Sequence, residues 1–307
     1  MTDSLELPRG IALAWGVAAS PRRGPKREMS VELIVEQAVE LADAEGIDAV
    51  SMAAVAKRLG FTPMSLYRYV SAKDDLLLLM QEEATGVPSL AYREADGWRE
   101  KMRTLFREQV DIYRRHPWLL SLPISGTPVT PNSSEWLEAG LSAFDGTPLG
   151  VDEKLAAALV VTGQARWTGT VLAGYVEAER ESGKTADEIA AHESALFDAV
   201  IAADAFPRLR AIIDAGAFTS THDPFVFGFE RALDGIEAYI AAGGEAPAAP
   251  AAPTDDDADV ADDKRYRAAL KATAAAEKAV RQAEKELRQA RRAQEQARKE
   301  ARARRAG

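Results

Sequence analysis

The segment that most constrains the fold of this chain is residues 51–73, SMAAVAKRLGFTPMSLYRYVSAK. Its pattern predicts a short helix, a glycine turn, a second very short helix and a basic residue at the start of a third helix. Ser51 can cap the first helix, because its hydroxyl can accept from backbone N–H groups that lack a partner there. Gly60 stands where that helix must end, since glycine tolerates positive φ. This layout is that of a helix-turn-helix.

The second helix is expected to cover residues 63–70, which is too short to be stable alone. Thr62 would cap it, and Pro63 suits its first position, where a missing N–H costs nothing. Leu66 and Val70 are the expected core anchors. The other residues form an exposed set of hydroxyls, aromatic rings and a guanidinium group: Met64, Ser65, Tyr67, Arg68 and Tyr69. Such a helix surface is more typical of contact with DNA bases than of packing.

The third helix is expected to begin at residues 71–74, Ser-Ala-Lys-Asp, which resemble a capping box with Asp in place of Glu. It would continue through Leu76 to Met80. Lys73 would lie in its first turn, where the ammonium group and the positive end of the helix dipole can both face a phosphate. We call residues 28–80 the head; they include the helix that links the head to the rest.

Residues 30–79 as a whole resemble the DNA-binding domain of the TetR family of bacterial transcriptional regulators. The resemblance rests on a first helix that ends in AEG and on the following SMAAVAKRLGFTPMSLYRYVSAKDDLL. More loosely, HPWLL, PNSSEWLEAGL and FGFERALDGIEAYI resemble the tetracycline-repressor-type ligand domain of actinobacterial members. The resemblance implies an all-α homodimer whose ligand domain changes shape and releases operator DNA.

The resemblance also implies roles for single residues in the head. Those expected to face base edges or nearby sugars are Pro63, Met64, Ser65, Tyr67 and Arg68. Those expected to hold phosphates are Ser51, Tyr69 and Lys73. Thr62 and Arg27 complete the predicted DNA-binding set.

The length and composition set limits on the class of protein. A chain of 307 residues can hold two domains and bury a sizeable core. It contains no cysteine, which excludes disulfides and thiolate metal sites and fits a reducing cytoplasm. No apolar run approaches the roughly 18 residues that a membrane span needs. Residues 11–19 resemble a signal-peptide core, but the acidic residues before them favour a short N-terminal helix that packs on the body.

The net charge of −10 is unevenly distributed. Residues 264–305 contain fifteen Lys and Arg and five Glu, so the rest of the chain carries −20. Within residues 22–73, eight basic and seven acidic side chains are close to balance, and the acidic ones belong mostly to the first helix. An acidic chain with a locally basic head predicts DNA binding that weakens strongly with salt.

The rest of the chain divides into an arm, a body, a linker and a tail. Residues 1–27 form the arm, which ends in PRRGPKR; it is expected either to follow the DNA backbone or minor groove or to be a solvated leader. Residues 81–243 form the body, which carries helical patterning throughout. Residues 244–263 are Ala/Pro-rich and then acidic, which predicts an extended, disordered linker. Residues 264–307 are the charged tail.

Four helices are predicted in the body. They cover residues 98–113, which end at His116-Pro117, then 133–144, 152–182 and 224–241. The last two are apolar on more than one side. This pattern is expected when two helices pair with their symmetry mates in the four-helix bundle of a dimer, and the alternative is deep burial within a monomer.

The tail is predicted to be helical because it is rich in Ala, Glu, Lys and Arg. Alanine recurs every seven residues from Ala269 to Ala297. A heptad with so little apolar area favours a solitary charged helix over a stable coiled coil. Its positive charge could bind DNA without sequence preference, fold back on the acidic body or linker, or remain solvated.

The motifs of the common enzyme classes are missing from the sequence. It contains no HExxH, no GxSxG and no GxxxxGK[ST], and its three histidines, His116, His192 and His222, show no ligand spacing. We therefore expect no catalytic residue, no metal and no cofactor.

An effector pocket is expected inside the body, where apolar walls meet a few polar groups. The candidate residues are Phe106, Val110, Tyr113, His116, Trp118, Trp136, Arg166, Trp167 and Tyr175. Arg166 could pair with an anionic ligand; the favoured alternative is an ion pair with Glu177, Glu179 or an acid of a partner subunit.

These observations predict a cytoplasmic, ligand-responsive transcriptional regulator, expected to be a repressor that binds a near-palindromic operator as a homodimer. The expected partners are double-stranded DNA, an unknown small-molecule effector and a second copy of the chain, with no membrane. The first alternative is an effector-independent architectural DNA binder that uses the basic tail. The second, a hydrolase on a helical scaffold, has no support in the sequence.

Overall fold

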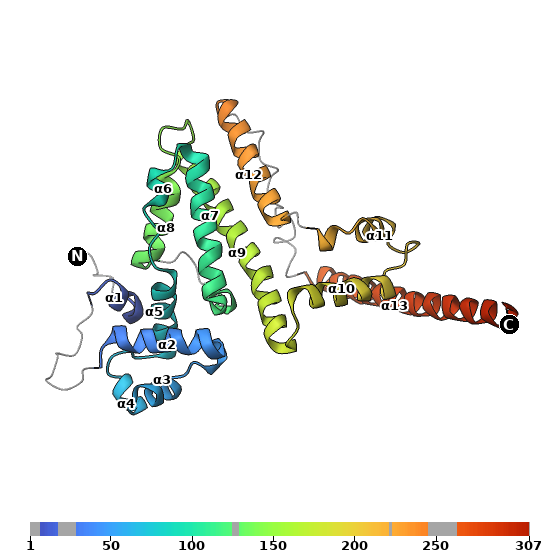
Figure 1. Cartoon of the computed structure of the whole chain (residues 1–307), viewed down its shortest axis with the longest axis horizontal. Coiled ribbons are helices and arrows are strands. Elements are labelled where there is room, and N and C mark those ends of the chain that lie inside the picture. Colours follow the sequence, from blue (N-terminus) through green and yellow to red (C-terminus); the bar gives the residue numbers. More distant parts are fainter. Residues whose placement is uncertain (1–6, 18–28, 125–128, 221–222, 245–262, 307) are drawn as a thin grey trace. The chain divides into compact units, whose positions relative to one another are not determined.

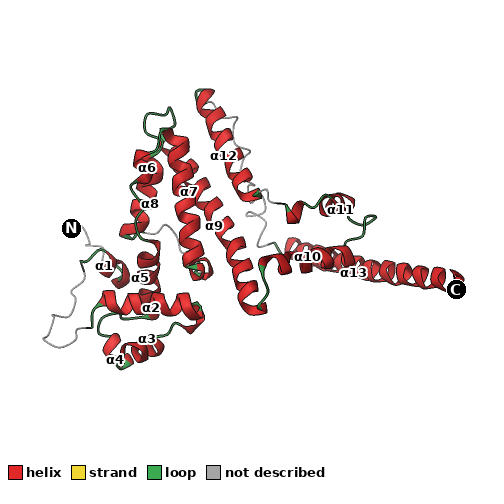
Figure 2. Cartoon of the chain, viewed as in Figure 1, coloured by secondary structure: helices red, strands yellow, loops and turns green. Residues whose placement is uncertain are grey.

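The structure of the chain is a computed structural model in which residues 7–17, 29–124, 129–220, 223–244 and 263–306 are described. Throughout these residues the regular elements are helices and none is a strand, which confirms the all-α prediction (Figure 2). The chain divides into two units, residues 1–245 and 246–307. No helix in the described ranges is both long and apolar enough to span a membrane.

The helices of the first unit follow the chain in the order shown in Figure 1. Those at the N-terminal end are α1 (Arg9–Ala14), α2 (Val31–Glu45), α3 (Met52–Leu59), α4 (Pro63–Leu66), α5 (Lys73–Thr85) and α6 (Ala91–Glu94). Those that follow are α7 (Gly97–Arg115), α8 (Pro131–Ser142), α9 (Val151–Ser182), α10 (Ala186–Val200), α11 (Pro207–Asp214) and α12 (Pro224–Ala241). Three short 3-10 helices are η1 (Ile47–Ala49), η2 (Pro117–Ser121) and η3 (Ala217–Thr219), and the second unit holds α13 (Lys264–Ala306).

Two predictions about the head are wrong in detail. The second helix ends at Leu66 rather than at residue 70, because the chain tightens there: the backbone N–H of Tyr69 donates to the Leu66 carbonyl three residues back. The capping box at residues 71–74 is absent. Ala72 occupies the N-cap position of α5, so Ser71 lies one residue too early for its hydroxyl to cap the helix.

The helices predicted in the body are confirmed with small shifts at their ends. Helix α12 has the predicted bounds, and α9 begins one residue earlier. Helix α7 extends to Arg115 and stops before His116-Pro117 as expected. Helix α8 begins at Pro131, two residues earlier than predicted, because proline is favoured in the first helical turn. The short helix expected near residues 11–19 is α1, but it packs mainly on α5 and the core of the head and not on the body as predicted.

Two hydrophobic cores hold the first unit together. The first lies in the head, where Ile34, Val50 and Leu76 are fully buried. The second lies among α7, α8, α9 and α12, and the rings of Phe106 and Phe229 stack in it with 4.1 Å between centroids. Burying a large apolar side chain contributes roughly 1.5–3 kcal/mol, so these clusters set the arrangement of the helices.

The closest packing in the body is the crossing of α7 and α9, which lie side by side in Figure 1. Gly169 is buried at this crossing, and a Cβ atom added there would lie 2.7 Å from the Cβ atom of Tyr113. Glycine is therefore needed for the close approach of the two helices, not for a special backbone angle.

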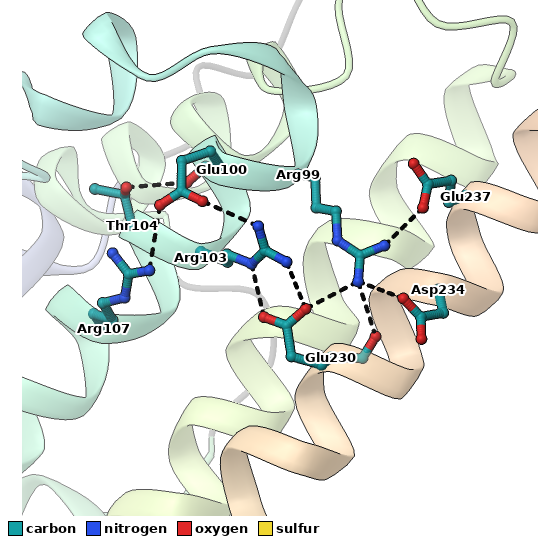
Figure 3. Close-up of polar contacts among 8 residues, drawn as sticks. All are labelled: Arg99, Glu100, Arg103, Thr104, Arg107, Glu230, Asp234 and Glu237. Carbon is teal, nitrogen blue, oxygen red and sulfur yellow. Dashed lines mark hydrogen bonds and ion pairs between the residues drawn. The ribbon is translucent and has the colours of Figure 1, made fainter.

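An ion network fastens α12 to the start of α7 (Figure 3). The Arg103 guanidinium donates to both carboxylate oxygens of Glu230, at 2.7 and 2.6 Å. Arg99 also bonds to Glu230, at 2.9 Å, and contacts Asp234 and Glu237. The hydrogen bonds from Arg103, with those from Arg99, lower the pKa of Glu230 from 4.5 to about 2. The network stabilises α12 on the side that faces α7.

We predict that Gly169→Ala destabilises the chain by about 1–3 kcal/mol, because the new methyl group would force α7 and α9 apart. The matched control is Gly174→Ala on the same helix, where the added Cβ atom meets nothing within 4 Å. That change should stabilise the chain by up to about 1 kcal/mol through helix propensity. Urea unfolding followed by circular dichroism measures both, and equal effects would contradict the packing argument.

We predict that Glu230→Gln lowers the free energy of unfolding at pH 7 by about 1–2 kcal/mol, allowing for partial solvent exposure. Because the folded-state pKa of Glu230 is depressed to about 2 from 4.5, its contribution is complete above pH 4.5 and is lost as the pH falls toward 2. The difference from the original chain should therefore shrink between pH 4.5 and 3.

The control for this prediction is Glu237→Gln, since that side chain is 60% exposed and contacts only Arg99 in the network. It should cost less than about 0.5 kcal/mol. A Glu230→Gln effect that stayed constant from pH 7 to pH 3 would show that the charge of Glu230 is not what stabilises α12.

Candidate nucleic-acid interface

The turn between α3 and α4 is built from local sequence signals. The Ser51 hydroxyl accepts from the backbone N–H of Ala54 at 3.1 Å and caps α3, as predicted. Gly60 ends α3 with φ of 75°, in the left-handed region that favours glycine. Pro63 takes the first position of α4, and Thr62 is its N-cap residue. The Thr62 hydroxyl, however, bonds to the Ser65 hydroxyl at 3.0 Å and not to a backbone N–H.

Helix α4 and the turn after it have a buried side and an exposed side. Leu66 and Val70 are fully buried in the core of the head, as predicted. On the outer side Met64 is 76% exposed, Tyr67 is 46% exposed and Arg68 is exposed. We call Met64, Tyr67 and Arg68 the reading surface. The two anchors fix its direction, because turning α4 over would expose them to water.

The remaining residues of the predicted DNA-binding set lie around the reading surface. Pro63, Thr62 and Lys73 are exposed, and Lys73 is the first residue of α5. Ser51 and Ser65 are half-buried. Tyr69 is also half-buried and packs against the core of the head. Arg27 lies outside the described residues, as do most of the arm and linker.

On this side of the head one exposed residue was not predicted, and one predicted basic residue is held by α2. Phe61, at the α3–α4 turn, is 39% exposed next to Thr62. Arg58 is one of the eight basic side chains of residues 22–73 that make the head locally basic, but α2 holds it: it pairs with Glu40 at 3.2 Å and donates to Gln37. The sequence gives a partial signal for Arg58, since acidic residues recur along α2.

The head is joined to the body through a carboxylate that the sequence reasoning missed. Asp43, on α2, accepts a hydrogen bond from the Trp118 indole N–H at 2.7 Å and bonds to Nδ1 of His116 at 2.8 Å. Trp118 is only 4% exposed and belongs to the core of the head, although it follows α7 in the chain. The only local signal for Asp43 is its spacing of four and eight residues from the buried Val39 and Val35.

A second junction joins α5 to α8. Glu82 contacts the backbone N–H of Asn132, and its carbonyl accepts from the Asn132 side chain at 2.9 Å. The Trp136 indole N–H donates to the Gly86 carbonyl at 3.0 Å, just after α5 ends. Both the α7 and the α8 sides of the body therefore hold the head through polar contacts.

The residues predicted for the effector pocket are divided among several environments. Tyr113 and Trp136 pack against both cores, Phe106 lies in the body core, and Trp118 and His116 lie at the Asp43 junction. Trp167 and Tyr175 are 58% and 45% exposed on α9. Val110 packs against the body core from α7.

Arg166 has main-chain partners and not acidic ones. Its guanidinium donates to the carbonyls of Leu120 and Leu122, at 3.2 and 3.0 Å. The expected bridge to Glu177 is not formed, because eleven residues of the same helix separate them by about 16 Å; Glu177 pairs with Arg180. Arg166 also faces Tyr113. Burial raises the pKa of Tyr113 above its usual value, and the nearby positive charge of Arg166 offsets part of that rise.

One cavity of about 20 Å³ lies between α7, α8 and α9. It is lined by Met102, Leu105, Gln109, Trp136, Leu137, Gly140, Ala158, Leu159, Val161 and Thr162. Trp136 alone comes from the predicted pocket set. The volume suits a water molecule or two, and a drug-sized ligand needs roughly 300 Å³ or more.

The fold and the outward-facing second helix define a helix-turn-helix DNA-binding protein. Residues 34–80 match the family model described as bacterial regulatory proteins, tetR family, and residues 91–240 match the model of the tetracyclin repressor-like C-terminal domain. The chain belongs to the TetR family. It is a transcriptional regulator of the repressor type, and its nucleic-acid partner is double-stranded DNA.

Known relatives are similar over most of this chain. The HTH-type transcriptional repressor DrrR1 of Streptomyces coeruleorubidus is 34% identical over 244 residues, which are 78% of this chain and 89% of that protein. An HTH-type transcriptional regulator of Saccharopolyspora erythraea is 30% identical and covers 53% of this chain and 69% of its own length. The structure of ActR from Streptomyces coelicolor in complex with actinorhodin has a TM-score of 0.56 at 24% identity, over 71% of this chain and 97% of that one.

We predict that Asp43→Ala lowers the free energy of unfolding by about 1–3 kcal/mol, because the buried indole N–H of Trp118 loses its acceptor. In a Trp118→Phe background, where that donor is gone, the same change should cost clearly less. Asp43→Asn, which keeps an acceptor oxygen, should fall between the original chain and Asp43→Ala. Urea unfolding of the four chains of this double-mutant cycle measures the coupling. Strictly additive costs would mean that the bond does not hold the head to the body.

Proposed function

We propose that the chain is a homodimeric repressor that binds a near-palindromic operator and is released by a small-molecule effector. The observation that carries the proposal is the reading surface: a thioether on α4, and an aromatic ring and a guanidinium group just after α4, face solvent, while the neighbouring Leu66 and Val70 are fully buried. Tyrosine and arginine can bond to base edges in the major groove, and a good arginine–base contact contributes about 1–3 kcal/mol of discrimination.

The proposed dimer rests on apolar side chains that α9 and α12 leave exposed. On α9 these include Leu159, Trp167 and Val176, each more than half exposed, and on α12 they include Val226 and Phe227, at 45% and 51%. An apolar surface of this kind on two long helices suits pairing with the same helices of a second copy. A dimer would set two α4 helices about 34–36 Å apart, in successive major grooves.

The proposed effector site lies in the body, around the cavity between α7, α8 and α9. Trp136 lines the cavity, and the other proposed residues, Phe106, Val110, Tyr113 and Arg166, lie on the same helices, which gives apolar walls with few polar groups. Because the cavity is only about 20 Å³, a ligand would have to separate the helices that enclose it. Trp167 and Tyr175 remain part of the proposed site only if a second copy covers their exposed side.

The proposed release mechanism follows from the way α7 ends. The residues after it, Trp118 and Leu119, are buried in the core of the head, and Asp43 of α2 bonds to Trp118. A ligand that moves α7 would therefore displace α2 and with it the α3–α4 unit that packs on α2. A tenfold loss of operator affinity needs only about 1.4 kcal/mol of differential binding.

We extend the proposal to location and chemistry. A regulator of a bacterial family acts on chromosomal DNA, so the chain is proposed to work in the cytoplasm. Its polar clusters are used for packing and DNA contact, so we propose a binding function and no catalysis. The competing proposal, an architectural binder without effector, predicts little sequence preference.

The test begins with genome-wide mapping of bound DNA, which supplies the operator, followed by fluorescence anisotropy on operator and random duplexes. We predict that the Tyr67→Ala/Arg68→Ala double variant loses about 10- to 100-fold in the ratio of operator to random-DNA affinity. Lys73→Ala should weaken both duplexes alike and reduce the salt slope by about 0.9, as expected for one phosphate contact.

The control for charge loss is Arg208→Ala, an exposed arginine on α11 outside the head. It should leave both affinities within about twofold. Unchanged operator preference in the double variant would overturn the assignment of the reading surface, and a chain that never preferred any sequence would favour the architectural alternative.

A further inference from the structure

Helix α13 carries a stripe of basic residues along one face. The stripe consists of Arg267, Lys271, Lys278, Arg281, Lys285, Arg288, Arg292 and Lys299. Successive members are three, four or seven residues apart, which is the spacing that keeps residues on one side of an α-helix. At 100° per residue all eight fall within an arc of about 100°, and none of the five glutamates of the helix falls in that arc. We call these eight residues the basic stripe.

The basic stripe is long and regular. It covers 33 of the 43 residues of α13, or about 48 Å at 1.5 Å per residue. One nearby acid, Glu277, contacts Arg281 at 3.8 Å, and the arginine is still 67% exposed. A single-sign row of this length matches a polyanion with regularly spaced charges better than it matches one small anion.

The residues on the other faces of α13 disfavour two other partners, a coiled-coil helix and a membrane surface. Alanine fills the heptad positions 269, 276, 283, 290 and 297, so the helix offers little apolar area to a coiled-coil partner. Leu270, Val280 and Leu287 are about half exposed and are widely spaced. Helices that lie on membranes need a continuous face of Leu, Phe or Trp, which α13 lacks.

We propose that the basic stripe of α13 is a second DNA contact, which binds the phosphates of duplex DNA beside the operator without reading its sequence. The role as an added contact rests on the proposed function, because the head must first bring the chain to DNA. Duplex DNA carries one negative charge per about 1.7 Å, a density that the acidic residues of this chain cannot match. A straight helix meets the backbone of a duplex only where the two cross, so about three or four stripe residues contact phosphates at once.

The proposed DNA contact of α13 lies outside the two segments that match family models. The two family models end at residues 80 and 240, before α13 begins at Lys264. Residues 264–305 carry a surplus of ten positive charges, and the rest of the chain carries −20. Because the head brings α13 close to the duplex, the stripe adds most to DNA affinity when the head is already bound.

The test compares two full-length variants with equal net charge. The stripe variant replaces six stripe residues by Gln: Lys271, Lys278, Arg281, Lys285, Arg288 and Arg292. The control variant replaces six arginines on other faces of α13 by Gln: Arg265, Arg291, Arg298, Arg302, Arg304 and Arg305. Glutamine preserves helix propensity, and circular dichroism at 222 nm verifies equal helix content. Affinity for a random duplex of about four helical turns is measured by anisotropy over a range of salt.

We expect the stripe variant to lose at least about tenfold in random-duplex affinity, with a salt slope lower by about 3, as for three or four lost phosphate contacts. The control variant should lose less than about threefold, since its basic stripe stays complete. Equal losses in both variants would overturn the proposal by showing an effect of net charge alone. Unchanged duplex affinity in both variants would also overturn the proposal. So would a stripe variant that lost affinity only for vesicles rich in anionic lipid and not for the duplex.

The same assay separates this inference from the proposed function. In the Tyr67→Ala/Arg68→Ala background, operator preference should disappear while the difference between stripe and control variants persists. Operator preference in the original chain, with no difference between the stripe and control variants, would overturn only the role of α13. A stripe effect without any operator preference in the original chain would overturn only the proposed function.

Discussion

The core of the head is closed by side chains that belong to the body. Ile112 at the end of α7, and Trp118 and Leu119 in η2, are buried among the residues of α2, α3 and α5. Removing them would expose apolar surface worth several kcal/mol, so the head cannot keep its packing if α7 moves independently. The direction of α4 depends in turn on this core, because Leu66 and Val70 anchor in it. One continuous cluster therefore connects α4 to the end of α7, in the body, where we propose the effector site.

Polar contacts give that connection a defined geometry. Asp43 holds the Trp118 indole, Glu82 holds Asn132, and Arg166 holds the carbonyls of Leu120 and Leu122, in η2 and just after it. Each of these hydrogen bonds has a defined direction. Leaving its buried donor or acceptor without a partner would cost free energy. The Arg99–Arg103–Glu230 network plays the same part for α12 against α7, while apolar side chains of α9 and α12 such as Trp167 and Phe227 stay exposed. Polar bonds fix positions within one chain, and the apolar faces remain available to a second copy.

The elements that could be predicted are those with local signals. Ser51, Gly60 and Pro63 mark helix ends through capping, positive φ and the lost proline N–H, and α7 stops where Pro117 forbids a helical residue before it. The predicted DNA-facing residues on α4 are exposed because helical periodicity separates them from the anchors. The failures have two causes. α4 ends early and Ala72 replaces Ser71 as the cap because local signals fix a helix end only to within a few residues. Arg166 bonds to carbonyls of another segment, which no local signal indicates. Asp43 shows no sign in the sequence of its contact 75 residues away.

The sequence by itself determined the helical class, the helix-turn-helix and the charge of α13, because each depends on propensity, capping and periodicity within one or two turns. Only the tertiary structure decided which polar groups meet, where the body closes the core of the head, and that the cavity among α7, α8 and α9 is small. Those outcomes depend on contacts between residues far apart in the chain, whose energies follow from shape and distance in the folded state.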